Sequence, residues 1–145
     1  MHPYAIIQAQ GGDIIFGDYN IIEENVKIVN QKRLDASGNP VRRAMRIGNY
    51  NMFEVGTSLD SSDVGDLNEF GIKSTIMRGC TIGINCKINP YVTLGSTSQR
   101  VKLESNSVVV SNGFIRIDSE PLLDTKKQGM KEMSAALAAL LPKNN

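Results

Sequence analysis

The residues that most often carry acid–base, nucleophilic or metal chemistry are scarce in this chain of 145 residues. Its single histidine is His2, beside the N-terminus. A zinc site with three histidine ligands would therefore need three copies of His2 to converge in a trimer. The sequence contains neither a Ser-His-Asp set nor a glycine-rich phosphate loop. It predicts no catalytic residue, no metal site and no cofactor site.

Two other groups of residues, a pair of cysteines and a set of three aspartates, are of types that can form disulfides or bind metals, but their number or spacing does not fit such a site. Cys80 and Cys86 are too few for a disulfide framework, and they indicate reduced, buried side chains of a cytosolic protein. Asp60, Asp63 and Asp66 are spaced like the acids of a calcium-binding loop, but the glycine and the later glutamate of such a loop are missing. We therefore interpret the three aspartates as residues of a turn.

The composition argues against several functional classes. Charged residues make up 21% of the chain and the formal net charge is +1, which is low for a nucleic-acid-binding protein. No apolar run approaches the roughly 18 residues of a membrane span, and the N-terminus lacks the layout of a signal peptide. Aromatic residues make up 6% and tryptophan is absent, so the core must be aliphatic. The sequence predicts a cytoplasmic protein with a single core.

The elements that position these residues follow a period of six, which neither an α-helix nor an amphipathic strand produces. From Val64 to Leu94 an apolar side chain recurs at every sixth position, and the same step returns within 16–28, 47–59 and 103–115. One hexad is a short strand and a turn, and three hexads make one triangular coil. Residues 1–118 are thus predicted to be an all-β, left-handed parallel β-helix of about 5–6 coils. The hand follows from the hexad signature, a known exception to right-handed crossovers.

The register arranges the inward-facing side chains in three apolar columns. Each column can stack as a continuous ladder, and Phe53 and Phe70 become vertical neighbours. Met1 and Ile7 also fall on core positions. The first column is Phe16, Ile47, Val64, Ile82 and Leu103; the second is Ile22, Phe53, Phe70, Ile88 and Val109; the third is Ile28, Leu59, Ile76, Leu94 and Ile115.

The breaks in the spacing fall at 7→16, 28→47, 59→64 and 94→103, always between the third column and the first. Random insertions would scatter over three corners, so this concentration supports the register. It predicts that every long loop leaves from one corner of the prism.

Small or amide side chains are expected four positions after each member of the first column, near the tight turns. Asparagine tolerates the left-handed backbone that turns require, and three stacked amides can form a hydrogen-bonded ladder. The residues at these positions are Asn20, Asn51, Asn68, Cys86 and Ser107.

The long loop from about Asn30 to Met45 is basic, with Arg33, Arg42 and Arg43 among its residues. Two interpretations stay open: a solvated loop, or a contact with a partner or an acidic surface. We take these three arginines as candidate partner-binding residues.

The N-terminal end of the prism is a second candidate surface, with His2 and Tyr4 as its candidate residues. An unpaired strand edge there would invite pairing with another protein, because solenoids need capping. We expect the chain either to have a naturally short N-terminus or to be truncated.

Residues 119–145 are predicted to be a linker and an amphipathic helix that starts near Asp124. Met130, Met133 and Leu137 recur at helical spacing. We expect the helix to fold back on or beside the β-helix, with partner binding through these three side chains as the alternative.

Several coils resemble those of the dynactin subunit 6 family. The resemblance covers residues 1–115, and FEVG is its most specific part, because a generic hexapeptide protein shares the spacing but not that string. The segments that carry it are His2-Pro3, FGDYNIIEE at 16–24, IGNYNMFEVG at 47–56 and ESNSVV at 104–109.

The resemblance implies a non-catalytic structural and adaptor subunit of the dynactin pointed-end complex, which supports dynein-based microtubule transport and the docking of cargo adaptors. In that family this β-helix pairs with a sister β-helix, dynactin subunit 5, and assembles with dynactin subunit 4 and an actin-related protein. It implies a cytoplasmic, cytoskeleton-associated protein that is not a homotrimer and neither binds nucleic acid nor inserts into membranes.

The alternative is a hexapeptide-repeat acyltransferase or a γ-carbonic-anhydrase-like enzyme. Proteins of these classes use a histidine as general base or several histidines as zinc ligands. A lone His2 in a terminal position argues against both. A detached β-helix domain of a nucleotidyltransferase-like protein ranks third, because the chain contains no catalytic domain of that kind.

Overall fold

The computed structural model describes residues 4–96, 98, 100–111, 115–117 and 123–140. The described elements are short strands of two to four residues, joined by turns and loops, and one helix follows them. In chain order the elements are β1 Ile6–Ala9, β2 Ile14–Phe16, β3 Ile21–Ile22, β4 Lys27–Asn30, β5 Arg33–Leu34, β6 Pro40–Val41, β7 Met45–Ile47, β8 Met52–Phe53, β9 Ser58–Asp60, β10 Asp63–Val64, β11 Glu69–Phe70, β12 Thr75–Ile76, β13 Thr81–Ile82, β14 Lys87–Ile88, β15 Thr93–Leu94, β16 Lys102–Leu103, β17 Ser107–Val109, β18 Ile115–Ile117 and α1 Leu123–Leu140.

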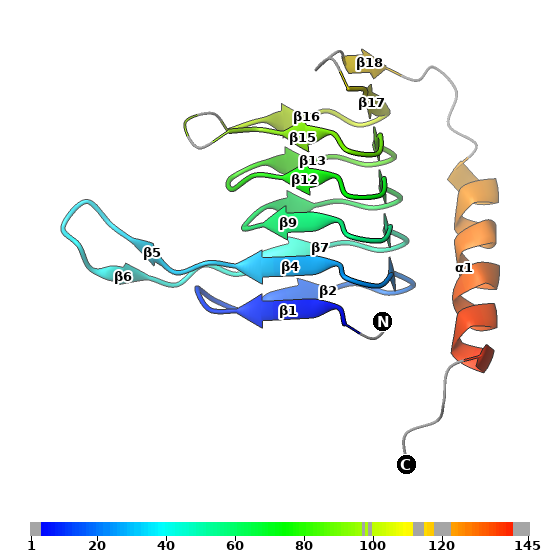
Figure 1. Ribbon diagram of the computed structural model, residues 1–145, viewed down its shortest axis with the longest axis horizontal. Helices are drawn as coiled ribbons and strands as arrows, with labels where there is room; N and C mark the ends of the chain where they lie inside the picture. The colour runs from blue at the N-terminus through cyan, green and yellow to red at the C-terminus, as the bar shows by residue number, and fades with distance from the viewer. Residues whose placement is uncertain (1–3, 97, 99, 112–114, 118–122, 141–145) are drawn as a thin grey trace.

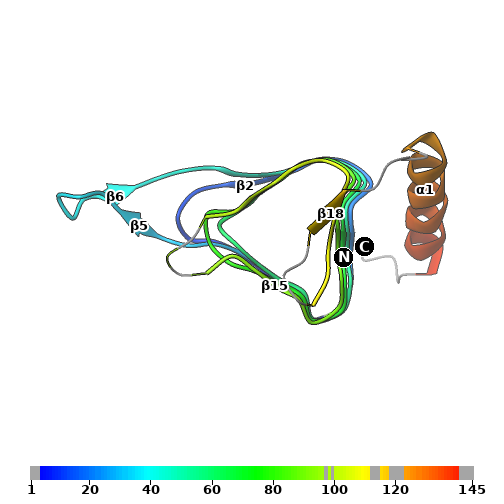
Figure 2. The same ribbon diagram turned by 90° about the horizontal axis from the view of Figure 1, so that it is seen from above.

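The strands build the three walls of a triangular prism (Figure 1). One wall has the order β1-β4-β9-β12-β15, the second β2-β7-β10-β13-β16, and the third β3-β8-β11-β14-β17-β18. Seen from above, the chain runs clockwise as it rises toward the viewer (Figure 2), which is the left-handed sense. The predicted left-handed parallel β-helix with a C-terminal helix is therefore confirmed.

The strand pairing confirms the first two predicted columns throughout. Phe16 pairs with Ile47, and the first column continues upward to Leu103. Ile22 pairs with Phe53, and the second column continues upward to Val109. A shift of one residue would have turned every one of these side chains outward.

The third column is confirmed from Ile28 to Leu94, but the prediction for Ile115 is wrong. Ile115 does not lie above Leu94, since β18 turns back and pairs antiparallel with β17, with Ile115 opposite Val109. At the other end, Ile7 pairs with Ile28 as expected. It is nevertheless 37% exposed, because β1 is the edge strand of its wall among the described residues. Met1 lies outside the described residues.

The core is a single apolar stack along the prism axis. The column members from Ile22 upward are buried, and Phe53 and Phe70 have no exposed surface. Their rings stack with centroids 4.6 Å apart and planes 1° from parallel. Cys80 and Cys86 are buried in the same stack, as predicted.

Asparagine side chains form the predicted ladder, one level per coil. The Asn20 side chain accepts a hydrogen bond from the Asn51 backbone N–H at 2.8 Å, and Asn51 accepts one from the Asn68 N–H at 3.0 Å. Asn68 in turn accepts one from the Cys86 N–H at 2.7 Å. Each amide also donates at 2.8 Å to a glycine carbonyl of the next coil: Gly48, Gly65 and Gly83.

The expectation that these asparagines adopt the left-handed backbone conformation is wrong. Positive φ angles occur one residue earlier, as at Tyr19 (60°), Tyr50 (60°) and Leu67 (61°). Each asparagine amide donates to the backbone of the turn in the coil above. The residue before the asparagine, and not the asparagine itself, adopts the left-handed backbone conformation. Bulky residues rarely adopt it.

The long loops all leave from one corner, as predicted. This corner joins the wall of β4 to the wall of β7, and the antiparallel hairpin β5–β6 projects from it (Figure 1). The hairpin pairs Arg33 with Val41 and Leu34 with Pro40. The loop between β15 and β16 leaves from the same corner (Figure 2).

Helix α1 lies outside the third wall and runs back along the prism (Figure 1; Figure 2). Lys131 lies 5.5 Å from the ring centre of Tyr19 and 5.9 Å from that of Tyr50, and the two rings stack on each other. The expectation that the helix folds back beside the β-helix agrees with this arrangement. None of the described residues form a helix with the length and hydrophobicity needed to span a membrane.

Candidate partner-binding surfaces

The described part of the chain holds no group of three or more His, Cys, Asp or Glu side chains that could bind a metal ion. Of the residues with chemical potential, His2 lies outside the described residues. Burial raises the pKa of the Cys80 thiol, although hydrogen bonds from Val101 and Ser62 oppose the shift. A buried thiol with a raised pKa is a poor nucleophile near neutral pH.

The three aspartates bond to neighbouring turns, as interpreted from the sequence. Asp63 accepts a hydrogen bond from the Arg46 backbone N–H at 3.0 Å, and Asp66 accepts one from the Asn49 N–H at 2.7 Å. Asp60 accepts hydrogen bonds from the side chains of Gln31 and Ser61, each at 2.8 Å. Each of the three carboxylates thus stabilises a turn of the prism through hydrogen bonds.

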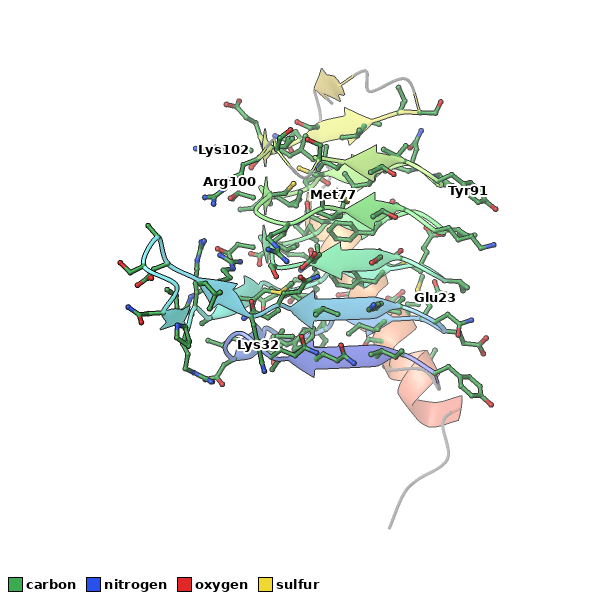
Figure 3. The ribbon with its side chains drawn as sticks, turned by 60° about the vertical axis from the view of Figure 1, so that its left-hand side comes forward. Glu23, Lys32, Met77, Tyr91, Arg100 and Lys102 are labelled. Carbon is green, nitrogen blue, oxygen red and sulfur yellow. The ribbon has the colours of Figure 1, made fainter. Side chains whose placement is uncertain are left out.

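Basic side chains gather at the corner from which the long loops leave. Figure 3 shows Lys32, Arg100 and Lys102 along one side of the molecule, although Lys32 is far from the other two in sequence. The guanidinium of Arg42 lies 4.0 Å from Asp13, and that of Arg43 lies 3.2 Å from Asp63. We call the following set the basic corner: Lys32, Arg33, Arg42, Arg43, Arg78, Arg100 and Lys102.

Arg33 is the half-buried centre of the basic corner. Its Nη2 donates to the carbonyl of Ser61 at 3.1 Å, while its buried Nε has no hydrogen-bond partner among the described residues. Burial lowers the pKa of Arg33, and the positive charges of Arg43, Arg78 and Arg100 lower it further, against the opposing effect of Asp60. The positive charges around Arg33 therefore outweigh the negative charge of the nearby carboxylate.

The structure brings Arg33 and Arg43 together with Arg78 and Arg100, which the sequence argument missed. The latter two are isolated in the sequence, outside the loop of residues 30–45. The register contains the signal that could have found them, because the corners before β13 and β16, which hold Arg78 and Arg100, lie two and three coils above the basic loop before β7.

Apolar side chains are exposed at the end of the prism formed by β1 and β2. Tyr4 is 80% exposed, and Ile6 in β1 (46%) and Ile15 in β2 (42%) are also exposed. Tyr4 is therefore accessible, as a partner-binding residue must be.

The helix presents its predicted binding residues only in part. Met130 is half-buried and Met133 is 44% exposed. Leu137 falls within the span of α1, but its side chain lies outside the described residues. In the described part of the chain, α1 contacts the prism through Lys131, which lies over the stacked rings of Tyr19 and Tyr50. A cation–π contact at an exposed site contributes about 0.5–1 kcal/mol.

A second charged feature is acidic. Burial raises the pKa of Glu54, and the neighbouring carboxylates of Glu23 and Glu69 raise it further, while Lys87 opposes them. These side chains lie in or directly after strands of the third wall, so the acidic feature and the basic corner belong to different parts of the prism. Figure 3 shows Glu23 on the side opposite Lys32 and Arg100.

Comparisons with known proteins extend this description. No protein-family model matches the chain. A solved structure from Bacillus cereus, named as a candidate acetyltransferase, has a TM-score of 0.45 and 16% identity, covering 91% of each chain.

Curated proteins named dynactin subunit 6 match more closely in sequence. The protein from Nematostella vectensis is 38% identical over 102 residues, which is 65% of this chain and 55% of the relative. That from Danio rerio is 34% identical, covering 61% and 50%. That from Dictyostelium discoideum is 34% identical, covering 75% and 60%.

The chain spans about half the length of the curated relatives that it matches. The matching proteins come from several distant organisms, and the shared stretch covers more than half of this chain in each of them. The chain is thus similar in sequence to dynactin subunit 6 proteins over more than half of its length, and the resemblance predicted from FEVG and the other matching segments is confirmed.

Proposed function

We propose that this chain acts as a non-catalytic structural subunit of dynactin. The observation that carries the proposal is the 38% identity with the Nematostella vectensis dynactin subunit 6 over 102 residues. A stacked prism suits such a role, because each coil contacts its neighbours and the whole forms a stiff block with long side surfaces.

In more detail, we propose that the chain belongs to the pointed-end complex of dynactin and supports dynein-based microtubule transport and cargo-adaptor docking. Its partners there would be dynactin subunit 5, as a sister β-helix, dynactin subunit 4 and an actin-related protein. This places the protein in the cytoplasm, associated with the cytoskeleton.

Two assignments of detail remain proposals. The first is the division into a β-helix domain of residues 1–118 and a C-terminal segment of residues 119–145. The second is the set of partner-binding residues. That set is His2, Tyr4, Arg33, Arg42, Arg43, Met130, Met133 and Leu137.

The test is a pull-down of the tagged chain from cell extract, with mass spectrometry of the bound proteins and light scattering of the purified chain. We expect a monomer that recovers a second β-helix protein together with the other pointed-end subunits. A Tyr4→Ala, Met133→Ala variant tests the predicted contacts, and a Lys27→Gln variant on an outer wall is its control.

The competing function is an acyltransferase or a γ-carbonic-anhydrase-like enzyme. It requires a homotrimer that binds zinc stoichiometrically or acetyl-CoA, with activity lost in His2→Ala. A purified homotrimer with one zinc ion per site would overturn the proposed structural role.

A further inference from the structure

The basic corner is hollowed into adjoining cavities. The larger cavity has a volume of about 550 Å³ and is lined by Lys32, Arg33, Arg78 and Arg100 together with the hydroxyl residues Ser96 and Ser98. A neighbouring cavity of about 250 Å³ is lined by Arg43, Lys102 and again Arg100. Because Gly79 and Arg100 line both cavities, the two form one continuous depression.

The cations of this depression are only partly neutralised. Among the described residues, carboxylates pair with Arg42 and Arg43. Arg78 donates a hydrogen bond to the neutral side chain of Gln31, and the buried Nε of Arg33 has no partner. Guanidinium groups that lie near one another are stabilised when an anion with two acceptor oxygens lies between them.

The cations form a row parallel to the prism axis. The basic loop before β7, the corner between β12 and β13 and the loop before β16 lie at three levels of one corner, with the short corner between β9 and β10 between the first two. Neighbouring levels are about 4.8 Å apart, so a row over three steps is about 14 Å long. A single phosphate ion would contact only part of such a row, whereas an extended peptide of about four residues has the same length.

Nucleic acid fits this row less well. Proteins that bind single strands combine a basic groove with aromatic side chains on which bases stack. The exposed Tyr19 and Tyr91 and the half-buried Tyr50 lie at other corners, and no aromatic residue lines the described cavities.

From this geometry we propose that the basic corner is a docking site for an extended, carboxylate-rich segment of a partner protein. Side-chain carboxylates of the segment lie between the guanidinium groups of Arg33, Arg78 and Arg100, and the hydroxyls of Ser96 and Ser98 complete the larger cavity. This proposal does not depend on the proposed role in dynactin, because it rests on the charges and shape of the corner.

The test is fluorescence anisotropy of the full chain with a fluorescein-labelled peptide of four Glu-Ser repeats, at low and at physiological salt. We expect saturable binding that weakens as salt increases, and at least tenfold weaker binding of the matched peptide of four Gln-Ser repeats. Equal binding of the two peptides, or no binding of the acidic one, would overturn the proposal.

Matched variants separate the corner from net charge. Arg78→Gln with Arg100→Gln should weaken binding of the acidic peptide about tenfold or more. Lys27→Gln with Lys87→Gln, which removes two charges outside the basic corner, should change binding less than about twofold. Should the first pair fail to fold, the exposed pair Lys32→Gln with Lys102→Gln should weaken binding in the same way. Equal losses in corner and control variants would contradict a defined site.

Competition identifies the class of ligand. Neither inorganic phosphate at the ionic strength of the buffer nor a thymidine oligonucleotide should displace the acidic peptide more effectively than unlabelled peptide does. Displacement by phosphate alone would indicate a site for single anions, and stronger displacement by the oligonucleotide would indicate a nucleic-acid surface. Either result would overturn the proposed partner.

Discussion

The rings of Phe53 and Phe70 stack face to face at the centre of the prism, one coil apart, with centroids 4.6 Å apart and no exposed surface on either. The β-helix imposes this geometry, because parallel pairing of β8 with β11 places Phe53 directly below Phe70. The same kind of parallel pairing aligns all the remaining members of the second column. A substitution in either ring therefore tests the register of the whole β-helix.

Replacing Phe70 with aspartate should therefore unfold the chain. The substitution removes the stacked ring and buries an unpaired carboxylate, at a cost on the order of 5 kcal/mol or more. Thermal and urea unfolding followed by circular dichroism measure it. Phe70→Leu is the control, with an expected loss of about 1–2 kcal/mol. An unchanged melting temperature for the aspartate variant would show that the register is wrong.

Asn68→Ala should destabilise the prism by about 2–3 kcal/mol, because the buried side chain accepts from the Cys86 N–H and donates to the Gly83 carbonyl. Urea unfolding gives the difference in free energy. Asn20→Ala, at the half-buried lower end of the ladder, should cost less. Equal losses at the two positions would argue that the ladder does not depend on burial.

Ser74→Ala should leave the stability unchanged or raise it slightly. The Ser74 side chain is fully buried, and its hydroxyl has no hydrogen-bond partner among the described residues, so removing the oxygen relieves a desolvation cost. Ser107→Ala is the matched comparison, because the Ser107 hydroxyl donates to the Glu104 carbonyl at 2.6 Å. It should lose about 1 kcal/mol. A larger loss at Ser74 than at Ser107 would contradict the predicted order.

Glu54→Gln should stabilise the protein at neutral pH, by less than about 1 kcal/mol because the site is partly exposed. Burial and the charges of Glu23 and Glu69 raise the pKa of Glu54 in the folded state. The protonated form is thus favoured on folding, and its contribution is present at acidic pH and lost as the pH rises through the folded-state pKa. Melting temperatures should differ at pH 7 and converge at pH 4. A constant difference across this range would show that ionisation of Glu54 is not the cause.

Much of the fold could be predicted because the period of six is a physical constraint on every wall. A side chain such as Ile76 stays buried only if the equivalent positions of the coils above and below are also apolar. The period of six in the sequence therefore identifies the members of each column. The corner of the long loops was also predictable, since an insertion between Ile28 and Ile47 leaves both in place. The hairpin reversal at β18 was not predicted from spacing, because Val109 and Ile115 are still six residues apart. The Asn112-Gly113 dipeptide between them is a hairpin signal that competes with the repeat.

The site was predicted less completely. Arg33 and Arg43 stand out in a basic loop, whereas Arg78 and Arg100 are single cations in ordinary turns, and only the stacking of corners brings the four together. The positive φ of Tyr50 was also missed. It depends on the hydrogen bonds of the neighbouring coil, which local sequence preference does not encode.

The short corner between β9 and β10, which holds Ser61 and Ser62, has a consequence for the length of the prism. Asp63 pairs with Thr81, and Ser62 bonds to Cys80, 18 residues further along the chain. Removing residues 64–81 would join Asp63 to Ile82 and set Ile88 above Phe53, with each remaining side chain in an equivalent place. The prism can therefore be shortened by one coil, which is about 4.8 Å of its length. The two coils brought together by the deletion would pair through the same kind of parallel strand contact as the other coils.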